Sequence, residues 1–201
     1  MRVEVVIKLA PPKRESAKNN LKEDGMQILV LNGSPRLEGN TKKMIAAFEE
    51  GAKLGGHQVD VVDVCQKKIG GCMACEYCHT KGGGACIQKD DMQEVYVLLQ
   101  QADMLIIASP IYYHGISGQL KCVIDRFYAA AYPGRPPHLK KAAMFLSSGD
   151  ADMYDGAVFS FEGDFVGYLG LENMGVFTAH GSENSSPEKL RELREFGASL
   201  R

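Results

Sequence analysis

The feature that most constrains the fold is an apolar run that breaks into a polar loop and then into a helix pattern. The run covers residues 28–31, and the loop over 32–41 reads Asn-Gly-Ser-Pro-Arg-Leu-Glu-Gly-Asn-Thr. In such a turn, backbone N–H groups and the N-terminus of the following helix point toward one place and attract an anion. The glycine spacing matches neither the dinucleotide fingerprint nor the Walker loop. We therefore predict a site for a single phosphate group.

Strand-like and helix-like segments alternate along the rest of the chain. Continuous apolar runs, typical of central parallel strands, occur at 28–31, 104–108 and 142–146, whereas 59–64 partly alternates in polarity, as an edge strand does. A fifth strand is expected at 175–179. Helices are expected from Asn40 to Gly55, from Asp90, over 120–127, more weakly within 154–170, and after Ser186. The pattern predicts an α/β fold with a doubly wound, parallel, five-stranded sheet in the order 2-1-3-4-5 and helices on both faces.

The composition narrows the class of protein. A chain of 201 residues, 45% of them hydrophobic, fits one domain with a buried core. The net charge of −2, without long runs of one sign, argues against nucleic acid or an anionic membrane as the main partner. No apolar run approaches the length of a bilayer span. Six cysteines without a secretory signal pattern indicate a cytoplasmic protein, in which clustered thiols usually serve metal or redox chemistry.

The first 25 residues differ from the rest of the chain. A short apolar patch interrupted by charges is followed by a polar stretch around Pro11 and Pro12. We therefore expect an N-terminal arm or linker at 1–25 and a single domain at 26–201. The arm is a candidate for contacts with a second subunit.

Two further loops are expected beside the phosphate turn. The segment 109–115 follows the third strand and combines a proline, two tyrosines and a glycine, and the segment 147–150 follows the fourth strand. In the order 2-1-3-4-5 both lie at the carboxyl ends of strands, next to the point where the order reverses. A stiff loop with aromatic side chains and exposed backbone polar groups suits a flat heteroaromatic ring. One phosphate site beside a planar-ring site describes flavin mononucleotide, FMN.

Two motifs taken together resemble the flavodoxin-like NAD(P)H-dependent FMN reductase family. The first is Gly33–Arg36 with Gly39–Thr41, and the second is Ser109–Tyr112 with Ser117–Lys121 and Asp125-Arg126. The likeness extends over about residues 27–180 and implies a flavodoxin-like fold that binds FMN. The residues that it implies are Ser34, Arg36, Asn40 and Thr41 at the phosphate, and Pro110, Ile111, Tyr112, Tyr113, Ser148 and Gly149 beside the isoalloxazine ring.

A cysteine-rich loop at 70–89 carries the second chemical motif. Its spacing is C-x2-C-x2-C-x7-C, formed by Cys72, Cys75, Cys78 and Cys86. The first two gaps equal those of the bacterial ferredoxin run, whereas the last gap is longer and no proline follows. A four-iron–four-sulfur cluster, free or disulfide-forming thiols, and zinc all remain open, although structural zinc more often uses two separated pairs. Within the family, the motif resembles the iron–sulfur flavoprotein branch, which implies a cluster on these four cysteines. Cys65 and Cys122 are expected to be core residues.

These features lead to an expected function. The primary interpretation is an FMN-dependent oxidoreductase that takes hydride from NAD(P)H and reduces a small acceptor such as a quinone, a nitroaromatic or a flavin, with no catalytic acid or base required. The alternative is an iron–sulfur flavoprotein that transfers electrons between a ferredoxin and another acceptor. A redox-sensing flavin binder whose thiols form disulfides is a third. The resemblance also implies a homodimer or homotetramer, and the cysteine loop is expected near the flavin of its own or a neighbouring subunit.

Overall fold

The computed structural model describes residues 25–201. The expected arm at 1–25 lies outside this range apart from Gly25, and so does its expected role in subunit contacts. The division between an arm and a domain at 26–201 therefore stays a prediction.

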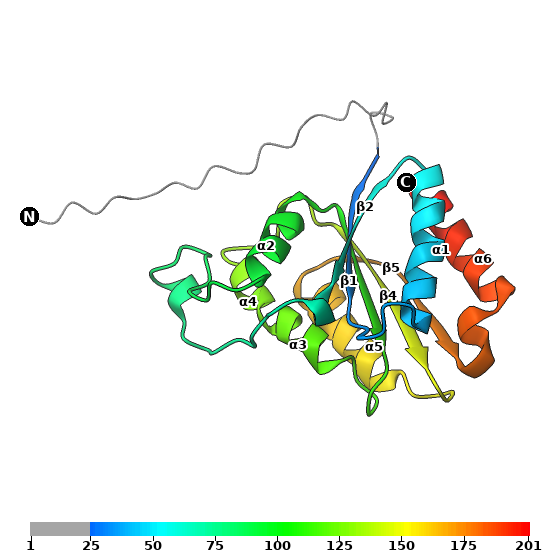
Figure 1. Cartoon of the computed structure of the whole chain (residues 1–201). Coiled ribbons are helices and arrows are strands. Elements are labelled where there is room, and N and C mark those ends of the chain that lie inside the picture. Colours follow the sequence, from blue (N-terminus) through cyan, green and yellow to red (C-terminus); the bar gives the residue numbers. More distant parts are fainter. Residues whose placement is uncertain (1–24) are drawn as a thin grey trace, which may run out of the picture.

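Five parallel strands form one sheet in the order β2-β1-β3-β4-β5 (Figure 1). The strands are β1 (Gln27–Asn32), β2 (Gln58–Asp63), β3 (Met104–Pro110), β4 (Lys141–Ser148) and β5 (Glu172–His180). The order, and the place of β2 at an edge, confirm the doubly wound arrangement that the alternating segments predict and the flavodoxin-like fold that the resemblance implies.

Helices cover both faces of this sheet (Figure 1). One face carries α1 (Asn40–Leu54) and α6 (Pro187–Ser199), and the other carries α2 (Met92–Gln101), α3 (Gly118–Asp125), α4 (Phe127–Ala130) and α5 (Asp155–Phe161). The helix expected within 154–170 consists of α5 and a π-helical continuation, η3 (Glu162–Tyr168). Short 3₁₀ helices form η1 (Val64–Gln66), η2 (Tyr77–His79) and η4 (Gly181–Ser185).

The central strand β1 is buried on both sides. Ile28 and Val30 belong to the core beneath α1 and α6, whereas Leu29 and Leu31 belong to the core beneath α2, α3 and α5. All four side chains are almost completely buried. A strand between two layers of helices needs apolar residues at every position, which explains the continuous apolar run.

Strand pairing brings three loops to one edge of the sheet. Asn32 pairs with Ala108 at the carboxyl ends of β1 and β3, and the N–H of Gly33 donates to the carbonyl of Ala108 at 2.8 Å. Pro110 at the end of β3 pairs with Ser147 of β4. The loops after β1, β3 and β4 therefore meet where open α/β sheets bind their ligands.

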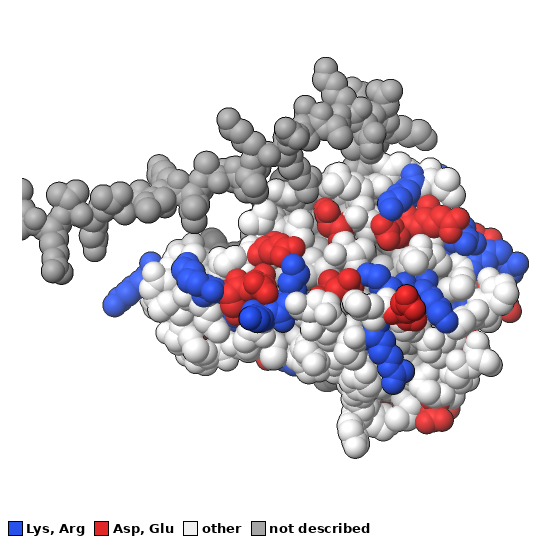
Figure 2. Space-filling model, in the orientation of Figure 1, with Lys and Arg blue, Asp and Glu red and all other residues white. Residues whose placement is uncertain are grey.

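Charged side chains of both signs are interspersed over the face shown in Figure 2. Several charged side chains of residues 25–201 form ion pairs, as Lys42 does with Asp63 at 2.9 Å and Lys67 with Glu94 at 2.6 Å. Among the helices of residues 25–201, none has the length and apolar character needed to cross a membrane.

Two glycines allow α1 and α6 to pack closely. A Cβ atom at Gly51 would lie 1.9 Å from the carbonyl oxygen of Arg194, and one at Gly197 would lie 2.5 Å from that of Phe48. Because backbone atoms cannot rotate away, we expect Gly51→Ala to lower the free energy of unfolding by about 3 kcal/mol or more, the upper range for an overpacked core. Urea unfolding measures this change.

The control for this prediction is Gly163→Ala, also at a helical position. A Cβ atom there meets nothing within 4 Å. We expect a change in the free energy of unfolding of less than about 1 kcal/mol, the size of the difference in helix propensity. Equal effects of the two substitutions would contradict the role of close packing at Gly51.

Candidate functional site

The N-terminus of α1 is open to a ligand. Its N-cap residue is Gly39, which makes no side-chain capping bond, and its first turn holds no acidic residue. Asn40 and Thr41 are the first two residues of the helix itself. The backbone N–H groups of an uncapped first turn and the positive end of the helix dipole favour an anion at this place.

The loop before α1 is held by its own polar contacts. Asn32 accepts a hydrogen bond from the N–H of Ser34 at 3.0 Å, and the hydroxyl of Ser34 accepts one from the N–H of Arg36 at 3.2 Å. The amide of Asn32 also donates to Asp63 at 2.8 Å, and Lys42 donates to the same carboxylate at 2.9 Å. The turn after β1 is thus tied to the ends of β1 and β2.

Asp63 gives this turn a dependence on pH. Partial burial opposes its ionisation, but the bonds from Lys42 and Asn32 outweigh burial and lower its pKa. A lowered pKa adds stability that is complete above the ordinary carboxyl pKa of about 4 and is lost as the pH falls through the lower value of the folded state. We expect Asp63→Asn to reduce the loss of stability between about pH 5 and pH 3, measured by urea unfolding at each pH.

The comparison variant for this pH dependence is Asp164→Asn. Asp164 is exposed and forms no ion pair with another side chain of residues 25–201. We expect its substitution to leave the pH profile close to that of the unmodified protein. A profile of Asp63→Asn that is parallel to the unmodified one would contradict the contribution of Asp63.

A pocket of about 310 Å³ lies at the carboxyl edge of the sheet, beside the N-terminus of α1. All the residues predicted to bind FMN line it except Tyr113: Ser34, Arg36, Asn40, Thr41, Pro110, Ile111, Tyr112, Ser148 and Gly149. Tertiary structure adds Gly39, Ser147, Gly181 and Asn184 to the lining. Four separate segments of the chain therefore form one pocket.

Tyr113 occupies the tip of a tight hairpin instead. Tyr112 and Gly115 exchange two backbone hydrogen bonds, of 2.9 and 3.0 Å, and Tyr113 and His114 between them have φ angles of +48° and +63°. Such a turn requires positive φ at both central residues, which non-glycine residues adopt only at a cost in energy. The side chain of Tyr113 is 101% exposed. Within one chain it faces solvent rather than the pocket.

Three buried polar residues, Thr41, Ser147 and Asn184, are part of the pocket lining. The hydroxyls of Thr41 and Ser147 lie 2.8 Å apart and are shielded from solvent. The amide nitrogen of Asn184 donates to the carbonyls of Ser148 and Gly181, both at 2.9 Å, whereas its buried Oδ1 has no hydrogen-bond partner among residues 25–201. An acceptor of this kind in a pocket lining fits a ligand that carries a hydroxyl or N–H group.

The four cysteines of the loop line a second, small pocket together with Arg126 and Tyr128. Two residues between them, Ala74 and Glu76, have φ angles of +50° and +56°, so the chain curls tightly here. The N–H of Ala74 lies 3.4 Å from the sulfur of Cys72. Within residues 25–201, no three His, Cys, Asp or Glu side chains are arranged to hold a single metal ion. The thiols surround one hollow but are not gathered around one point.

The two remaining cysteines lie outside this pocket. Cys65 belongs to η1 and its thiol lies 3.3 Å from the carbonyl of Gly33, and burial is the first cause of its raised pKa. Cys122 lies on α3. Both are partly buried. Neither contributes to the lining of the cysteine pocket.

The cysteine pocket and the pocket at α1 share no lining residue. The loop 70–89 leaves the carboxyl end of β2 as expected, but it then projects beyond α2 and α4, on the side of the sheet opposite α1 (Figure 1). Within one chain the two sites are therefore separate. The cysteine loop therefore does not lie beside the predicted flavin pocket of its own chain. That it lies near the flavin of a neighbouring subunit stays a prediction.

Comparison with known proteins adds to this geometry. Residues 26–191 match the family of NADPH-dependent FMN reductases. Iron–sulfur flavoproteins from Archaeoglobus fulgidus and Methanocaldococcus jannaschii are 40% and 43% identical over 101 residues. That stretch is 50% of this chain in both alignments, and 45% and 50% of the respective relatives. The chain thus spans about half the length of the curated relatives it matches.

Solved structures share the fold at lower sequence identity. The NAD(P)H:quinone oxidoreductase from Methanothermobacter marburgensis has a TM-score of 0.65 and 21% identity, with 88% of this chain and 96% of that chain covered. The FMN-dependent NADH-azoreductase from Bacillus anthracis, in complex with FMN, has a TM-score of 0.61 and 14% identity, with 85% and 94% covered. The family match extends from the start of β1 into α6 and includes both loops that carry the predicted motifs. The chain therefore belongs to the NADPH-dependent FMN reductase family and is similar to its iron–sulfur flavoproteins.

Proposed function

We propose that the protein is an FMN-dependent oxidoreductase that takes hydride from NAD(P)H and reduces a small acceptor such as a quinone, a nitroaromatic or a flavin. One observation carries this proposal. A pocket of about 310 Å³ joins an uncapped helix N-terminus to the loops that follow β3 and β4. When bound there, FMN supplies the ring that accepts and releases electrons, and the protein supplies binding and orientation.

The phosphate end of the pocket is formed by the turn after β1. Ser34 and Thr41 offer hydroxyl donors, Asn40 offers an amide, and Arg36 adds a positive charge beside the N-terminus of α1. Charge-assisted hydrogen bonds to a phosphate are stronger than bonds between neutral groups. Because the contacts of Asn32 and Asp63 hold this turn in place, little ordering is needed when a phosphate binds.

The ring end of the pocket is formed by the loops after β3 and β4. Pro110, Ile111 and Tyr112 supply a stiff apolar wall, and Ser148 and Gly149 form the neighbouring wall. The unpartnered Oδ1 of Asn184 adds an acceptor for a donor group of the flavin. Arg36 and Tyr112 are the ionisable side chains among the lining residues of this pocket. The lining residues therefore fit the binding and orientation of a flavin.

A homodimer or homotetramer belongs to this proposal. Tyr112 in the pocket lining is exposed, and the exposed Tyr113 beside it projects from the same loop. A second subunit would cover the flavin, and it would also allow the projecting cysteine loop to approach a flavin other than its own. Light scattering of the full chain tests this part, and a monomer would contradict it.

The second candidate function is electron transfer between a ferredoxin and another acceptor, through FMN and a four-iron–four-sulfur cluster. Four thiols that line one pocket, on a loop with left-handed residues between them, support it. A single zinc ion requires ligands about 2.3 Å from one centre, and the cysteines are not gathered in that way. A polynuclear cluster accepts thiolates that are set further apart, so the geometry favours a cluster over zinc. Cys72, Cys75, Cys78 and Cys86 would hold it.

An anaerobic experiment separates these functions. The full chain is prepared with ferrous iron, sulfide and FMN, and its flavin, iron, sulfide and free thiols are quantified on one sample. Oxidation of NADH or NADPH with a quinone as acceptor supports the oxidoreductase. Reduction by a reduced ferredoxin, without turnover of NAD(P)H, supports the electron-transfer protein instead. Failure to bind FMN would contradict both proposals.

A further inference from the structure

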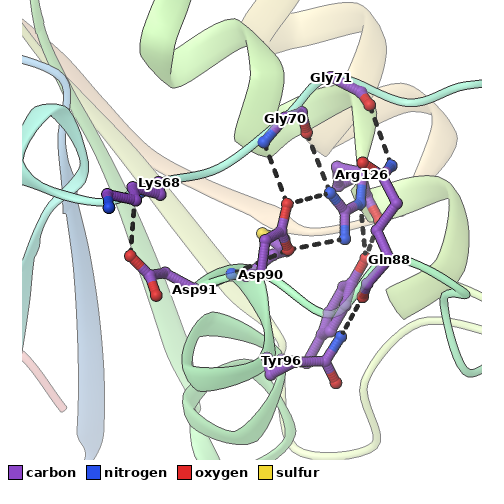
Figure 3. Close-up of polar contacts among 10 residues, drawn as sticks. Lys68, Gly70, Gly71, Gln88, Asp90, Asp91, Tyr96 and Arg126 are labelled. Carbon is purple, nitrogen blue, oxygen red and sulfur yellow. Dashed lines mark hydrogen bonds and ion pairs between the residues drawn. The ribbon is translucent and has the colours of Figure 1, made fainter.

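The two ends of the cysteine loop are joined at its base by polar contacts (Figure 3). The carboxylate of Asp91 accepts from the N–H of Lys68 at 2.7 Å, and that of Asp90 accepts from the N–H of Gly70 at 3.0 Å. The side chain of Gln88 donates to the carbonyl of Gly71 at 3.1 Å. Residues just before and just after the four cysteines are therefore held side by side.

Arg126 lies at the centre of this base (Figure 3). Its guanidinium binds Asp90 through two nitrogens, at 2.9 and 3.1 Å, and donates to the carbonyl of Gly70 at 3.0 Å. Its Nε donates to the hydroxyl of Tyr96 at 3.3 Å. The side chain of Arg126 therefore contacts Gly70 before the cysteines, Asp90 after them and Tyr96 on helix α2.

The same arginine also forms part of the wall of the cysteine pocket. Its side chain is only 1% exposed. Four of the five N–H groups of its guanidinium have acceptors, and the second N–H of Nη2 has none within residues 25–201. A buried positive charge thus forms part of the wall of the pocket that the four thiols line.

We propose that Arg126 is a positioning residue for the cluster on Cys72, Cys75, Cys78 and Cys86. It ties both ends of the loop to α2 and to the start of α4, so that the four thiols face one hollow before iron arrives. Its buried charge in the pocket wall stabilises the more negative, reduced form of the bound cluster. This inference rests on the proposed cluster.

Physical reasons support both parts of this role. Holding the ends of a loop together removes much of the entropy that the loop would otherwise lose when its cysteines converge on a metal group. Residues around the ligands of a metal commonly change its affinity about 10- to 100-fold. Positive charge and hydrogen bonds near the sulfurs raise the reduction potential of an iron–sulfur cluster. Asp90 opposes this charge, because its carboxylate forms the ion pair with the guanidinium.

Three variants of the full chain test the proposal. Arg126→Gln removes the charge and the bidentate contact, Arg126→Lys keeps the charge and loses the planar fork, and Asp90→Asn keeps the guanidinium without its counter-charge. The matched control is Arg194→Gln, which breaks the ion pair of Arg194 with Glu50 between α6 and α1 on the other face of the sheet. Each protein is loaded anaerobically with ferrous iron and sulfide. Iron retention against a chelator and the midpoint potential of the cluster are then measured.

The expected results differ in sign between variants. Arg126→Gln binds iron about 10- to 100-fold more weakly than the unmodified protein, and its remaining cluster has a lower potential. Arg126→Lys also loses iron faster but keeps a potential near the original value. Asp90→Asn raises the potential, because the arginine charge is no longer neutralised. A merely structural role would not shift the potential in opposite directions for Arg126→Gln and Asp90→Asn.

Other outcomes would overturn the inference. The inference is wrong if Arg126→Gln retains iron as well as the Arg194→Gln control does and its cluster has the same midpoint potential. If Arg126→Gln does not fold, the potentials of the other two variants decide, and an unchanged potential in Asp90→Asn contradicts the role. If the unmodified protein binds no stoichiometric iron and sulfide, the proposed cluster is wrong. Protease cleavage within 70–89 then tests the loop contacts alone, and cleavage of Arg126→Gln at the unmodified rate contradicts them.

Discussion

Replacing Asn40 and Thr41 together by alanine is expected to weaken FMN binding by roughly 10²- to 10⁴-fold, because each side chain loses a hydrogen bond to a charged phosphate worth about 1.5–3 kcal/mol. Both residues begin α1 and line the pocket. Thr41 is also the partner of the Ser147 hydroxyl, at 2.8 Å. Loss of its hydroxyl therefore removes a ligand contact and leaves a buried polar group without its partner. Titration of the quenching of flavin fluorescence measures the affinity.

The control for this pair lies on the same helix. Glu49 and Lys53 form an i,i+4 ion pair near the other end of α1. Their joint replacement by alanine removes a surface pair worth about 0.3–0.5 kcal/mol and leaves the pocket intact. We expect it to leave the FMN affinity unchanged. An unchanged affinity in Asn40→Ala/Thr41→Ala would show that the phosphate does not bind at the N-terminus of α1.

Replacing Cys75 by serine is expected to remove the iron–sulfur cluster while flavin binding persists. A hard hydroxyl is a poor substitute for a thiolate toward iron and sulfide. Cys75 lines the cysteine pocket, which shares no residue with the pocket at α1. Anaerobically loaded protein should lose the broad absorption of the cluster and its stoichiometric iron. Electron delivery to one-electron acceptors should slow, whereas the affinity for FMN should stay within about twofold, since no flavin contact changes.

Cys122→Ser is the matched control for this loss. Cys122 lies on α3, is partly buried and does not line the cysteine pocket. We expect its substitution to leave iron and sulfide content unchanged. Equal iron in Cys75→Ser and in the unmodified chain would show that Cys75 is not a ligand. Absence of iron from all three proteins would leave a plain FMN reductase whose cysteines serve packing or thiol redox chemistry.

Thiol chemistry has its own measurable signature. All six cysteines are free thiols in the structure. Cys78 is buried, and this burial is the first cause of its raised pKa. A disulfide between loop cysteines would lower the count of free thiols after mild oxidation, while a cluster would release four thiols when its iron is removed by a chelator. Mass spectrometry before and after chelation distinguishes these cases.

The order of strands and the turn after β1 were both predictable from local sequence. Runs such as 104–108 are apolar at every position because a central parallel strand is covered on both faces, and 59–64 is mixed because β2 lies at an edge. Short loops after β1 and β3 must lie at the carboxyl edge of a parallel sheet. The residues of these two loops are therefore predicted to share one pocket from the sequence pattern alone.

Other parts of the site depend on contacts between distant segments. Asn184 reaches the pocket because η4 follows β5 and folds toward the end of β4. No local sequence pattern predicts this contact. Tyr113 was expected beside the flavin, but a turn with two positive φ angles directs it to solvent. Glycine or asparagine usually marks such a turn, and the pair Tyr113-His114 carries neither.

The cysteine spacing by itself predicted that the four thiols lie together, because residues three apart on a tight loop can face one hollow and the glycines before Cys86 let the chain turn back. Only the tertiary structure decided where that hollow lies and what holds it. At the base of the loop Arg126, which is 36 residues after Asp90, forms a partly buried ion pair with that carboxylate. A buried charge requires a partner, and that partner is chosen by packing rather than by sequence distance.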